Sequence, residues 1–308
     1  MRKFVNKEYF RKPRNLFSKA FKRSIATQLI EMTITKAVIL ARGLGTRMQR
    51  RVEGLKLDPT AEEYANKGWK AFIPMSGGRP FLDYTLYFLR EVGFKEICLV
   101  IGPEHSVMKE YYARLDQKLD DISISFAIQE KPLGTANAVY SAKEFVGNDS
   151  FMMLNGDNLY PKEAMKILRD QDEEICYVIG FEKDALVRNS NFDAERIKAF
   201  AVMEVDDNWN LIRIVEKPED PEKYRTKRGI LVNMNLWRFT PDIFWACERI
   251  KPHPIRKEYE ITAAVQLLID EKVTPIRVIP VKAGVLDLTY RTDIPVVMDK
   301  LKALQLPF

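Results

Sequence analysis

The sequence is poor in the side chains that build metal centres and disulfide bonds. It has only three cysteines and two histidines among 308 residues, and none of them stands at the spacing of a zinc site. Cys98, Cys176 and Cys247 lie far apart in apolar stretches, which predicts buried free thiols in a reducing compartment, and we expect a cytoplasmic protein. No run of 18 apolar residues occurs, so no membrane-spanning helix is expected.

Excess positive charge is absent from most of the chain, although the whole carries a net charge of +6. Residues 1–30 hold nine Lys or Arg and one Glu, a net charge of +8, so the remaining 278 residues sum to −2. A nucleic-acid-binding surface needs clustered Lys and Arg. The body of the protein therefore lacks the charge pattern for a nucleic-acid partner.

The basic residues at the start indicate an N-terminal extension, residues 1–33, ahead of a domain of residues 34–308. Beyond Pro13, apolar residues recur at helical spacing with Lys and Arg between them, the pattern of a basic amphipathic helix. Such a helix suits a membrane surface or a partner protein. It equally suits packing on its own domain or on a second subunit of a homo-oligomer. A further alternative is that translation starts at Met32, just before the first expected strand.

From Lys36 onward, short apolar runs alternate with segments of helical periodicity. This alternation predicts an α/β fold with a Rossmann-like, mostly parallel sheet flanked by helices and with ligands at the carboxyl ends of the strands. After residue 200, alternating runs between turns predict an antiparallel or mixed, β-rich half. The expected strands are 36–40, 96–101, 122–128, 151–154, 200–205, 211–215, 230–235, 275–279 and 285–288. The expected helices are 80–92, 104–115, 135–145, 241–247, 259–269 and 294–303.

The first expected strand ends in a glycine-rich loop that contains an arginine, Gly43-Leu44-Gly45-Thr46-Arg47. Backbone N–H groups of such a loop can approach phosphate oxygens closely, and the arginine adds a cation that can bind them bidentately. A dinucleotide-binding fingerprint would need glycine where Met48 stands, and a Walker A loop would need Gly-Lys-Ser/Thr. The loop therefore indicates a phosphate-binding site that is neither a dinucleotide-binding fingerprint nor a Walker A loop.

The segment from Ala37 to Met48 resembles the signature of the nucleoside-diphosphate-sugar pyrophosphorylases, which join a nucleotide to a sugar 1-phosphate. The resemblance implies the nucleotide-diphospho-sugar transferase type of fold and a catalytic role for Arg47. It also implies nucleotide contacts from the loop residues Leu40, Ala41, Gly43, Gly45 and Thr46. One departure is Arg42, where the family tends to have a small residue. Arg42 either adds a second cation beside the nucleotide or points outward.

The family signature continues to a catalytic lysine, matched here by Lys70 in Lys70-Ala71-Phe72-Ile73-Pro74. This lysine stands 23 positions after Arg47, whereas the family usually leaves far fewer. Residues 49–68 therefore look like an insertion. Lys56 is a rival for the role, but its surroundings match the signature less well.

A second motif, Gln129-Glu130-Lys131-Pro132-Leu133-Gly134-Thr135, resembles the family's base-binding segment. The amide of Gln129 offers both a donor and an acceptor to the edge of a base. Gly134 lets the backbone approach the base or the sugar, and Thr135 is placed to cap the helix that follows it.

Two carboxylates are expected to hold Mg²⁺, the cofactor that the resemblance implies. Asp157 follows an apolar strand in Asn155-Gly156-Asp157-Asn158, and carboxylate oxygens suit a magnesium ion that also bridges phosphates. Asp287, in Leu286-Asp287-Leu288-Thr289, resembles the family's second metal carboxylate.

Contacts with the sugar phosphate are implied for four residues. The segment Val215-Glu216-Lys217-Pro218 resembles the sugar-phosphate motif, in which Glu216 would accept hydrogen bonds from hydroxyl groups and Lys217 would pair with the phosphate. Asn233 resembles the family's sugar-contacting asparagine, and Asn155 joins the set from the end of its strand. Glu258 and Thr262 match a further acidic element less specifically.

In this order the motifs predict an enzyme that transfers a nucleotidyl group from an NTP to a sugar 1-phosphate and releases pyrophosphate. UTP is favoured, with dTTP second, because Gln129 and its loop suit a pyrimidine, while ATP, CTP and GTP stay open. Glucose 1-phosphate is the default sugar only because it is the family's commonest substrate. A cytidylyltransferase for phosphocholine is one alternative, disfavoured by the sugar motif. A non-catalytic subunit that senses nucleotide sugars is another, but it would be expected to lose Arg47, Lys70 or Asp157.

Overall fold

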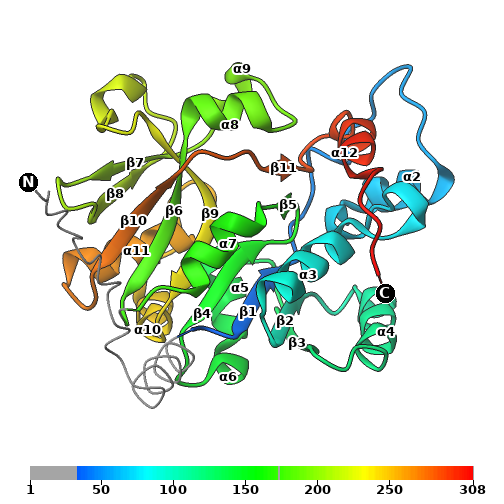
Figure 1. The fold of residues 1–308 in the computed structure, drawn as a ribbon, viewed down its shortest axis with the longest axis horizontal. Helices are drawn as coiled ribbons and strands as arrows, with labels where there is room; N and C mark the ends of the chain where they lie inside the picture. Colours follow the sequence, from blue (N-terminus) through cyan, green and yellow to red (C-terminus); the bar gives the residue numbers. More distant parts are fainter. Residues whose placement is uncertain (1–32, 173, 308) are drawn as a thin grey trace, which may run out of the picture.

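The computed structural model describes residues 33–172 and 174–307. The expected amphipathic helix of the N-terminal extension therefore lies outside the described residues. The centre of the molecule is a nine-stranded sheet with the main strand order β10-β6-β9-β4-β1-β2-β3, to which β7 and β8 are attached through β9 (Figure 1). Its strands are β1 (Lys36–Leu40), β2 (Glu96–Ile101), β3 (Ser123–Ile128), β4 (Phe151–Asn155), β6 (Cys176–Glu182), β7 (Val202–Val205), β8 (Leu211–Val215), β9 (Leu231–Phe239) and β10 (Ile276–Val281).

The sheet is mostly parallel, as expected, with one antiparallel insertion on its main path. Strands β1, β2, β3 and β4 run parallel to one another, and β10 runs parallel to β6. Strand β9 lies between β4 and β6 and is antiparallel to both. A separate two-stranded ladder joins β5 (Asn158–Leu159) to β11 (Leu286–Asp287), so the segment after β4 pairs with one near the end of the chain.

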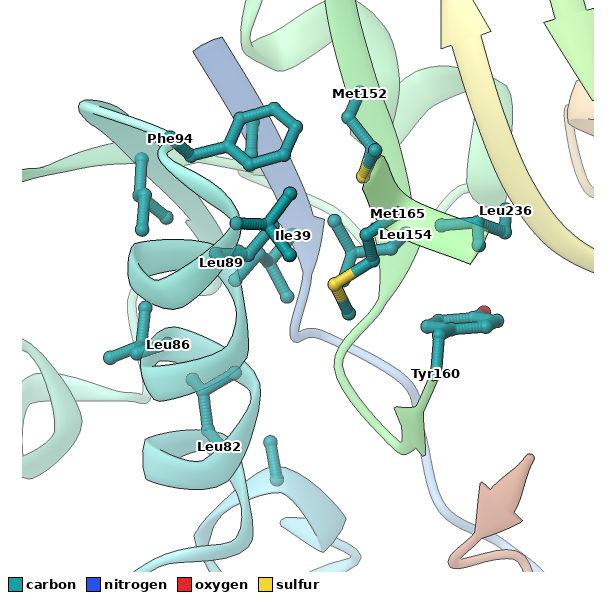
Figure 2. Close-up of a cluster of buried hydrophobic side chains, with 14 of the residues drawn as sticks. Ile39, Leu82, Leu86, Leu89, Phe94, Met152, Leu154, Tyr160, Met165 and Leu236 are labelled. Carbon is teal, nitrogen blue, oxygen red and sulfur yellow. The ribbon is translucent and has the colours of Figure 1, made fainter. Parts of the chain in front are cut away.

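Helices cover both faces of the sheet because successive residues of each strand point to opposite sides. In β1, Ala37 and Ile39 belong to one buried cluster and Val38 to the other. Figure 2 shows Ile39, Met152 and Leu154 facing side chains of neighbouring helices in the first cluster. That cluster takes in α3 (Phe81–Val92), α4 (Ser106–Asp116), α7 (Lys162–Arg169) and α8 (Lys183–Asn189). The second takes in α5 (Thr135–Ser141), α6 (Lys143–Val146), α10 (Asp242–Arg249) and α11 (Ile261–Asp270).

A third buried cluster lies away from the main sheet and unites the two ends of the described chain. It contains Met48 at the end of the glycine loop, Ala61 and Ala65 of α2 (Pro59–Lys67), and Ile294 and Val297 of α12 (Asp293–Leu301). Helices α2 and α12 thus both contribute side chains to this cluster, at the same end of the molecule (Figure 1). The second part of the expected insertion is therefore a helix packed on the rest of the protein.

Most expected elements are present with shifted ends. The strands 36–40, 96–101 and 211–215 match their predicted bounds, whereas the helix expected at 135–145 is divided into α5 and α6, and the strand expected at 285–288 is only the two-residue β11. The sequence pattern did not predict α2, or any element between residues 158 and 199, including the buried strand β6 and the short α9 (Ala194–Ile197). None of the described helices has both the length and the apolar character needed to cross a membrane.

Candidate active site

A cavity of about 590 Å³ opens where β1, β3 and β4 end. This is the edge at which parallel strands direct their carboxyl ends and at which such folds bind ligands, and the volume suits a nucleotide-sized ligand. Twelve of the predicted site residues line it: Leu40, Ala41, Gly43, Gly45, Thr46, Arg47, Lys70, Gln129, Gly134, Thr135, Asn155 and Asp157. The motifs that follow β1, β3 and β4 therefore meet in one place.

The glycine loop needs its second glycine because another part of the chain lies against it. Gly45 has a φ of 61°, which residues with a side chain rarely adopt. A Cβ atom on Gly45 would lie 2.3 Å from the carbonyl oxygen of Gly68. Gly68 ends helix α2 in a left-handed conformation, so the end of the insertion supports the loop directly. The side chain of Arg47, on the same loop, is exposed at the cavity.

Arg42, the departure from the family pattern, is directed into the protein. Its Nε and one terminal nitrogen each donate to the carboxylate of Glu104 at 2.8 Å, and the other terminal nitrogen donates to the backbone oxygen of Gln129. The guanidinium therefore ties the loop after β1 to the segments after β2 and β3. Burial raises the pKa of the Glu104 carboxyl, but the hydrogen bonds and charge of Arg42 outweigh it, and the net pKa is lowered.

The amide of Gln129 is held from within its own motif. Its Nε2 donates to the carbonyl oxygen of Gly134 at 3.1 Å and to Oδ1 of Asn137 at 2.9 Å. Because the backbone carbonyl can only accept, it fixes which end of the Gln129 amide is the donor. With the NH₂ group so engaged, the carbonyl Oε1 is the group that Gln129 can offer to a ligand in the cavity.

The expected capping role of Thr135 is wrong. The N-cap of α5 is Gly134, and no side chain caps that helix. The hydroxyl of Thr135 instead accepts from the backbone N–H of Ile261, the first residue of α11. Gly134 similarly makes room for another segment, since a Cβ there would lie 2.5 Å from the carbonyl oxygen of Tyr259. The Gln129 motif thus docks on the segment before α11, which brings Glu258 into the cavity wall.

Lys70 and Asp157 form an ion pair at the cavity, with 2.6 Å between Nζ and Oδ2. The side chains of Lys70 and Asp157 are 15% and 26% exposed, so the pair is partly shielded from water yet open to a ligand. Lys56, the rival lysine, is exposed on the insertion and is not among the described residues that line the cavity. If a phosphate entered the cavity, the ammonium group of Lys70 could move from the carboxylate of Asp157 to the phosphate.

The two predicted metal carboxylates are brought close together. The backbone N–H of Leu288 donates to the carbonyl oxygen of Asp157, and β5 pairs Asn158 with Asp287. Burial, and then the negative charge of Asp157, raise the pKa of Asp287. Two neighbouring carboxylates that repel each other are a donor set that suits Mg²⁺.

Both carboxylates also have partners within the chain, which limits how they could hold an ion. Asp287 accepts from Arg196 through Oδ1 and from Asn158 through Oδ2. A carboxylate has about four lone-pair positions, so it can accept these bonds and still bind a cation. Among the described residues, no group of three His, Cys, Asp or Glu side chains is arranged to hold a metal ion. Asp157 and Asp287 thus fit a magnesium ion that takes its other ligands from phosphates and water.

Of the four residues predicted to contact the sugar phosphate, Asn155 lines the described cavity and the other three do not. Glu216 and Lys217 are exposed just beyond β8, while Asn233 is buried in β9. The side-chain oxygen of Asn233 accepts from the backbone N–H of Asn235, and its amide nitrogen donates to Asn235 Oδ1. These residues cluster beside β7, since Val202 pairs with both Val215 and Val232. Asp287 is also outside the cavity lining.

One buried hydroxyl connects the sugar region to the carboxylates. Tyr160 Oη donates to the carbonyl oxygen of Met234 at 2.6 Å, next to Asn235, and lies 3.4 Å from Asn158 Oδ1. Lys217 and Asn235 both have positive φ, at 43° and 57°. This conformation costs energy for residues other than glycine, and residues that adopt it are often found at functional sites.

Several cavity residues were not found from the sequence. Gly68 and Ala71 come from the end of the insertion and the short helix after it, and Thr289 comes from the segment after β11. The sequence carried a signal for Gly68, because glycine commonly ends a helix in a left-handed conformation. It carried no signal that this glycine would lie on the loop of Gly45.

Comparison with known proteins gives a family match over most of the chain. The model of the family described as nucleotidyl transferase matches residues 36–283. The low-salt glycan biosynthesis nucleotidyltransferase Agl11 of Haloferax volcanii is 30% identical over 237 residues, which are 77% of this chain and 57% of that protein. The chain thus spans little more than half the length of Agl11.

Two further similarities cover nearly the full length of the other protein. The UTP–glucose-1-phosphate uridylyltransferase AglF of Haloferax volcanii is 27% identical over 258 residues, 84% of this chain and 93% of AglF. The structure of the inositol-1-phosphate CTP transferase from T. maritima superposes with a TM-score of 0.65 at 16% identity, covering 89% of this chain and 98% of that one. At this sequence identity, the structural likeness shows a shared fold alone.

Proposed function

The chain belongs to the nucleotidyl transferase family, and from that premise we propose that it transfers a nucleotidyl group from an NTP to a sugar 1-phosphate. An oxygen of the sugar phosphate attacks the α-phosphorus of the NTP and forms a new P–O bond. The bond from the α-phosphorus to the bridging oxygen of the β-phosphate breaks, and pyrophosphate leaves. Such reactions depend on positioning and on the neutralisation of charge more than on proton transfer.

The observation that carries this proposal is the ion pair of Lys70 and Asp157 beside the loop of Arg47 in one cavity. Two cations there can offset the charge that develops on the α-phosphate and on the leaving pyrophosphate. Lys70 starts the reaction paired with Asp157, and we expect its ammonium group to turn toward the phosphates when they bind. Backbone N–H groups of Gly43 and Gly45 would approach the phosphates closely.

Asp157 and Asp287 would hold Mg²⁺, which when bound neutralises phosphate charge as a Lewis acid. The remaining roles belong to the chain itself. Gln129 would accept from a donor on the base through Oε1. Lys217 would bind the phosphate of the sugar 1-phosphate and orient its oxygen for attack, while Glu216, Asn233 and Asn155 would contact the sugar phosphate.

We propose UTP as the first-choice nucleotide, dTTP as the second, and glucose 1-phosphate as the default sugar. A Gln129 that presents its carbonyl oxygen suits the N3–H of a uracil or thymine ring. The similarity to AglF, named as a UTP–glucose-1-phosphate uridylyltransferase and covered to 93% of its length, supports UTP and glucose 1-phosphate. Cytosine, adenine and guanine also carry donors, so the base has to be measured.

The decisive experiment is a pyrophosphate-release screen of five NTPs against a panel of sugar 1-phosphates, with inositol 1-phosphate and phosphocholine included, in Mg²⁺ and in EDTA. We expect release with UTP or dTTP and a hexose 1-phosphate, and none in EDTA. Release only with CTP and a non-sugar phosphate would replace the sugar assignment. Absence of release with every pair would overturn the proposed activity.

A further inference from the structure

The guanidinium of Arg291 is buried and binds two segments, residues 48–49 and 62–66, that lie far from Arg291 in the sequence. The residue is 2% exposed. Its Nε donates to the carbonyl oxygen of Met48 at 2.8 Å, and one terminal nitrogen donates to Glu62 Oε1 at 2.7 Å. The other terminal nitrogen donates to Asn66 Oδ1 and, at 3.4 Å, to the carbonyl oxygen of Gln49. A guanidinium has the donors and the fixed planar shape to hold all of these at once.

Two of these acceptors belong to the turn that carries Arg47. The backbone N–H of Gln49 donates to the carbonyl oxygen of Gly45 at 3.0 Å, and that of Arg50 donates to Arg47 at 3.3 Å. Arg291 donates to the carbonyl oxygens of the next two residues after Arg47. The turn that carries Arg47 is therefore closed by a hydrogen bond to Gly45 and is held from its far side by Arg291.

The other two acceptors belong to the insertion, which returns to the same loop. Glu62 and Asn66 lie on α2, one turn apart, and α2 ends at Gly68. Gly68 lies against the loop, since a Cβ added there would lie 2.4 Å from the carbonyl oxygen of Leu44. The chain thus leaves the active site after Arg47, passes through α2, and comes back at Lys70. We call residues 49–68 the brace.

Arg291 is itself held on a rigid turn. The carboxylate of Asp293 accepts from the backbone N–H groups of Thr289 and Tyr290 at 2.9 and 2.7 Å. Asp287 lies just before this turn, and Thr289 lines the cavity. The contacts of Arg291 therefore connect the segment of the second carboxylate to the glycine loop and the brace.

We propose that the brace holds the catalytic loop in place and that Arg291 is the positioning residue that locks it there. This inference rests on the function proposed above. A glycine loop is conformationally free by itself, and ordering it costs entropy that fixed neighbours can remove in advance. Arg47 acts on charge that develops during transfer, so its position affects turnover more than substrate binding.

The test compares Glu62→Gln with Glu63→Gln, two substitutions on adjacent residues of α2. Glu62 receives the buried guanidinium, while Glu63 is exposed and pairs with Lys67 at 2.6 Å. We expect Glu62→Gln to lower kcat about tenfold, with KM for the NTP within about twofold, at a temperature where the variant is fully folded. Glu63→Gln should stay within about twofold of the wild type in both constants.

A second pair of measurements separates positioning from simple stability. Arg291→Lys keeps the charge but loses the planar fork, so it should lower kcat at least as much as Glu62→Gln. Hydrogen–deuterium exchange of the amides of residues 43–49 should become about fivefold faster in Glu62→Gln, because the Gln side chain can still accept from Arg291 but the bond loses the charge that strengthens it. The same amides should be unchanged in Glu63→Gln.

The outcomes distinguish this inference from the proposed function. A lower Tm in Glu62→Gln with unchanged kcat and unchanged exchange at residues 43–49 would reduce Arg291 to a structural role. If the wild type releases no pyrophosphate with any substrate pair, the proposed function fails, and the exchange measurement still decides whether the brace orders the loop. Should Arg291→Lys not fold, Glu62→Gln carries the test alone.

Discussion

We call the part of the molecule built on β1–β4 the nucleotide half and the part built on β6–β9 the sugar half. The two halves bring their predicted residues together in different ways. In the nucleotide half, the predicted side chains already surround one cavity and hold each other, as Lys70 holds Asp157. In the sugar half, Lys217 and Glu216 are exposed outside the described cavity lining, and Asn233 is bonded to Asn235. The nucleotide half is thus organised before its ligand, whereas we expect the sugar half to take its binding geometry from the substrate.

The largest effect should come from Asp157, the carboxylate of the ion pair in the nucleotide half. Asp157→Asn removes the charge that pairs with Lys70 and that would hold Mg²⁺, without changing the size of the side chain. We expect Mg²⁺-dependent pyrophosphate release to fall by about 10³-fold or more, with the far-ultraviolet circular dichroism unchanged. Full activity in this variant would discard Asp157 as a metal ligand.

Removing the lysine of the same pair should affect the nucleotide half alone. We expect Lys70→Ala to lower kcat by about 10²- to 10³-fold, because Lys70 offsets charge that develops during transfer. KM for the sugar 1-phosphate should change little, as measured by steady-state kinetics in both substrates. Lys56→Ala, at an exposed lysine of the insertion, is the matched control and should behave as the wild type. Near-normal turnover of Lys70→Ala would remove it from the catalytic role.

The convergence of the predicted residues in the nucleotide half follows from its topology. Gln129 follows β3 and Asp157 follows β4, and the parallel strands β1, β3 and β4 of one sheet must end at the same edge. Their convergence was therefore predictable without knowing any side-chain contact. The sugar half offers no such rule, because β8 pairs with β7, off the main path of the sheet, and the register shifts between Glu204 and Val205. One residue of shift moves a side chain to the opposite face.

Other features were missed for different physical reasons. Strand β6 is a continuous buried run, Cys176–Glu182, and such a run has no alternation that separates a strand from a buried helix segment. Helix α2 did carry end signals, with Asp58 as its N-cap and Gly68 after its last turn. Thr135 caps α11 in place of its own helix. That contact joins residues more than a hundred positions apart, which no local pattern contains.

A substitution in the sugar half should give the opposite kinetic signature to that of Lys70. We expect Lys217→Ala to raise KM for the sugar 1-phosphate about tenfold, since a hydrogen bond to a charged phosphate is worth roughly 1.5–3 kcal/mol, with KM for the NTP unchanged. Gln129→Ala should show the mirror image, with a raised KM for the NTP only. If Lys217→Ala changed both constants equally, the separation into two halves would not describe how the substrates bind.

The smallest effect concerns the stability of the nucleotide half and depends on pH. His105 is buried at 3% exposure beside the Arg42–Glu104 pair, and its Nδ1 accepts from the backbone N–H of Gly102 at 2.9 Å. The ring of Trp69 packs on it, with 5.0 Å between the ring centroids. The imidazole is thus held neutral, because a protonated Nδ1 could not accept this bond.

Burial lowers the pKa of His105 below its ordinary value of 6.5, outweighing Glu104, which raises it, while Arg42 adds to the lowering. The unfolded chain therefore takes up a proton first as the pH falls. The stability that the neutral ring contributes is full above pH 6.5, and it is lost as the pH falls from there through the folded pKa. Asparagine at position 105 can accept the same bond from Gly102 without titrating. We expect the Tm of the wild type to fall more than that of His105→Asn between pH 7 and pH 5, and parallel Tm profiles would show that His105 is not the group responsible.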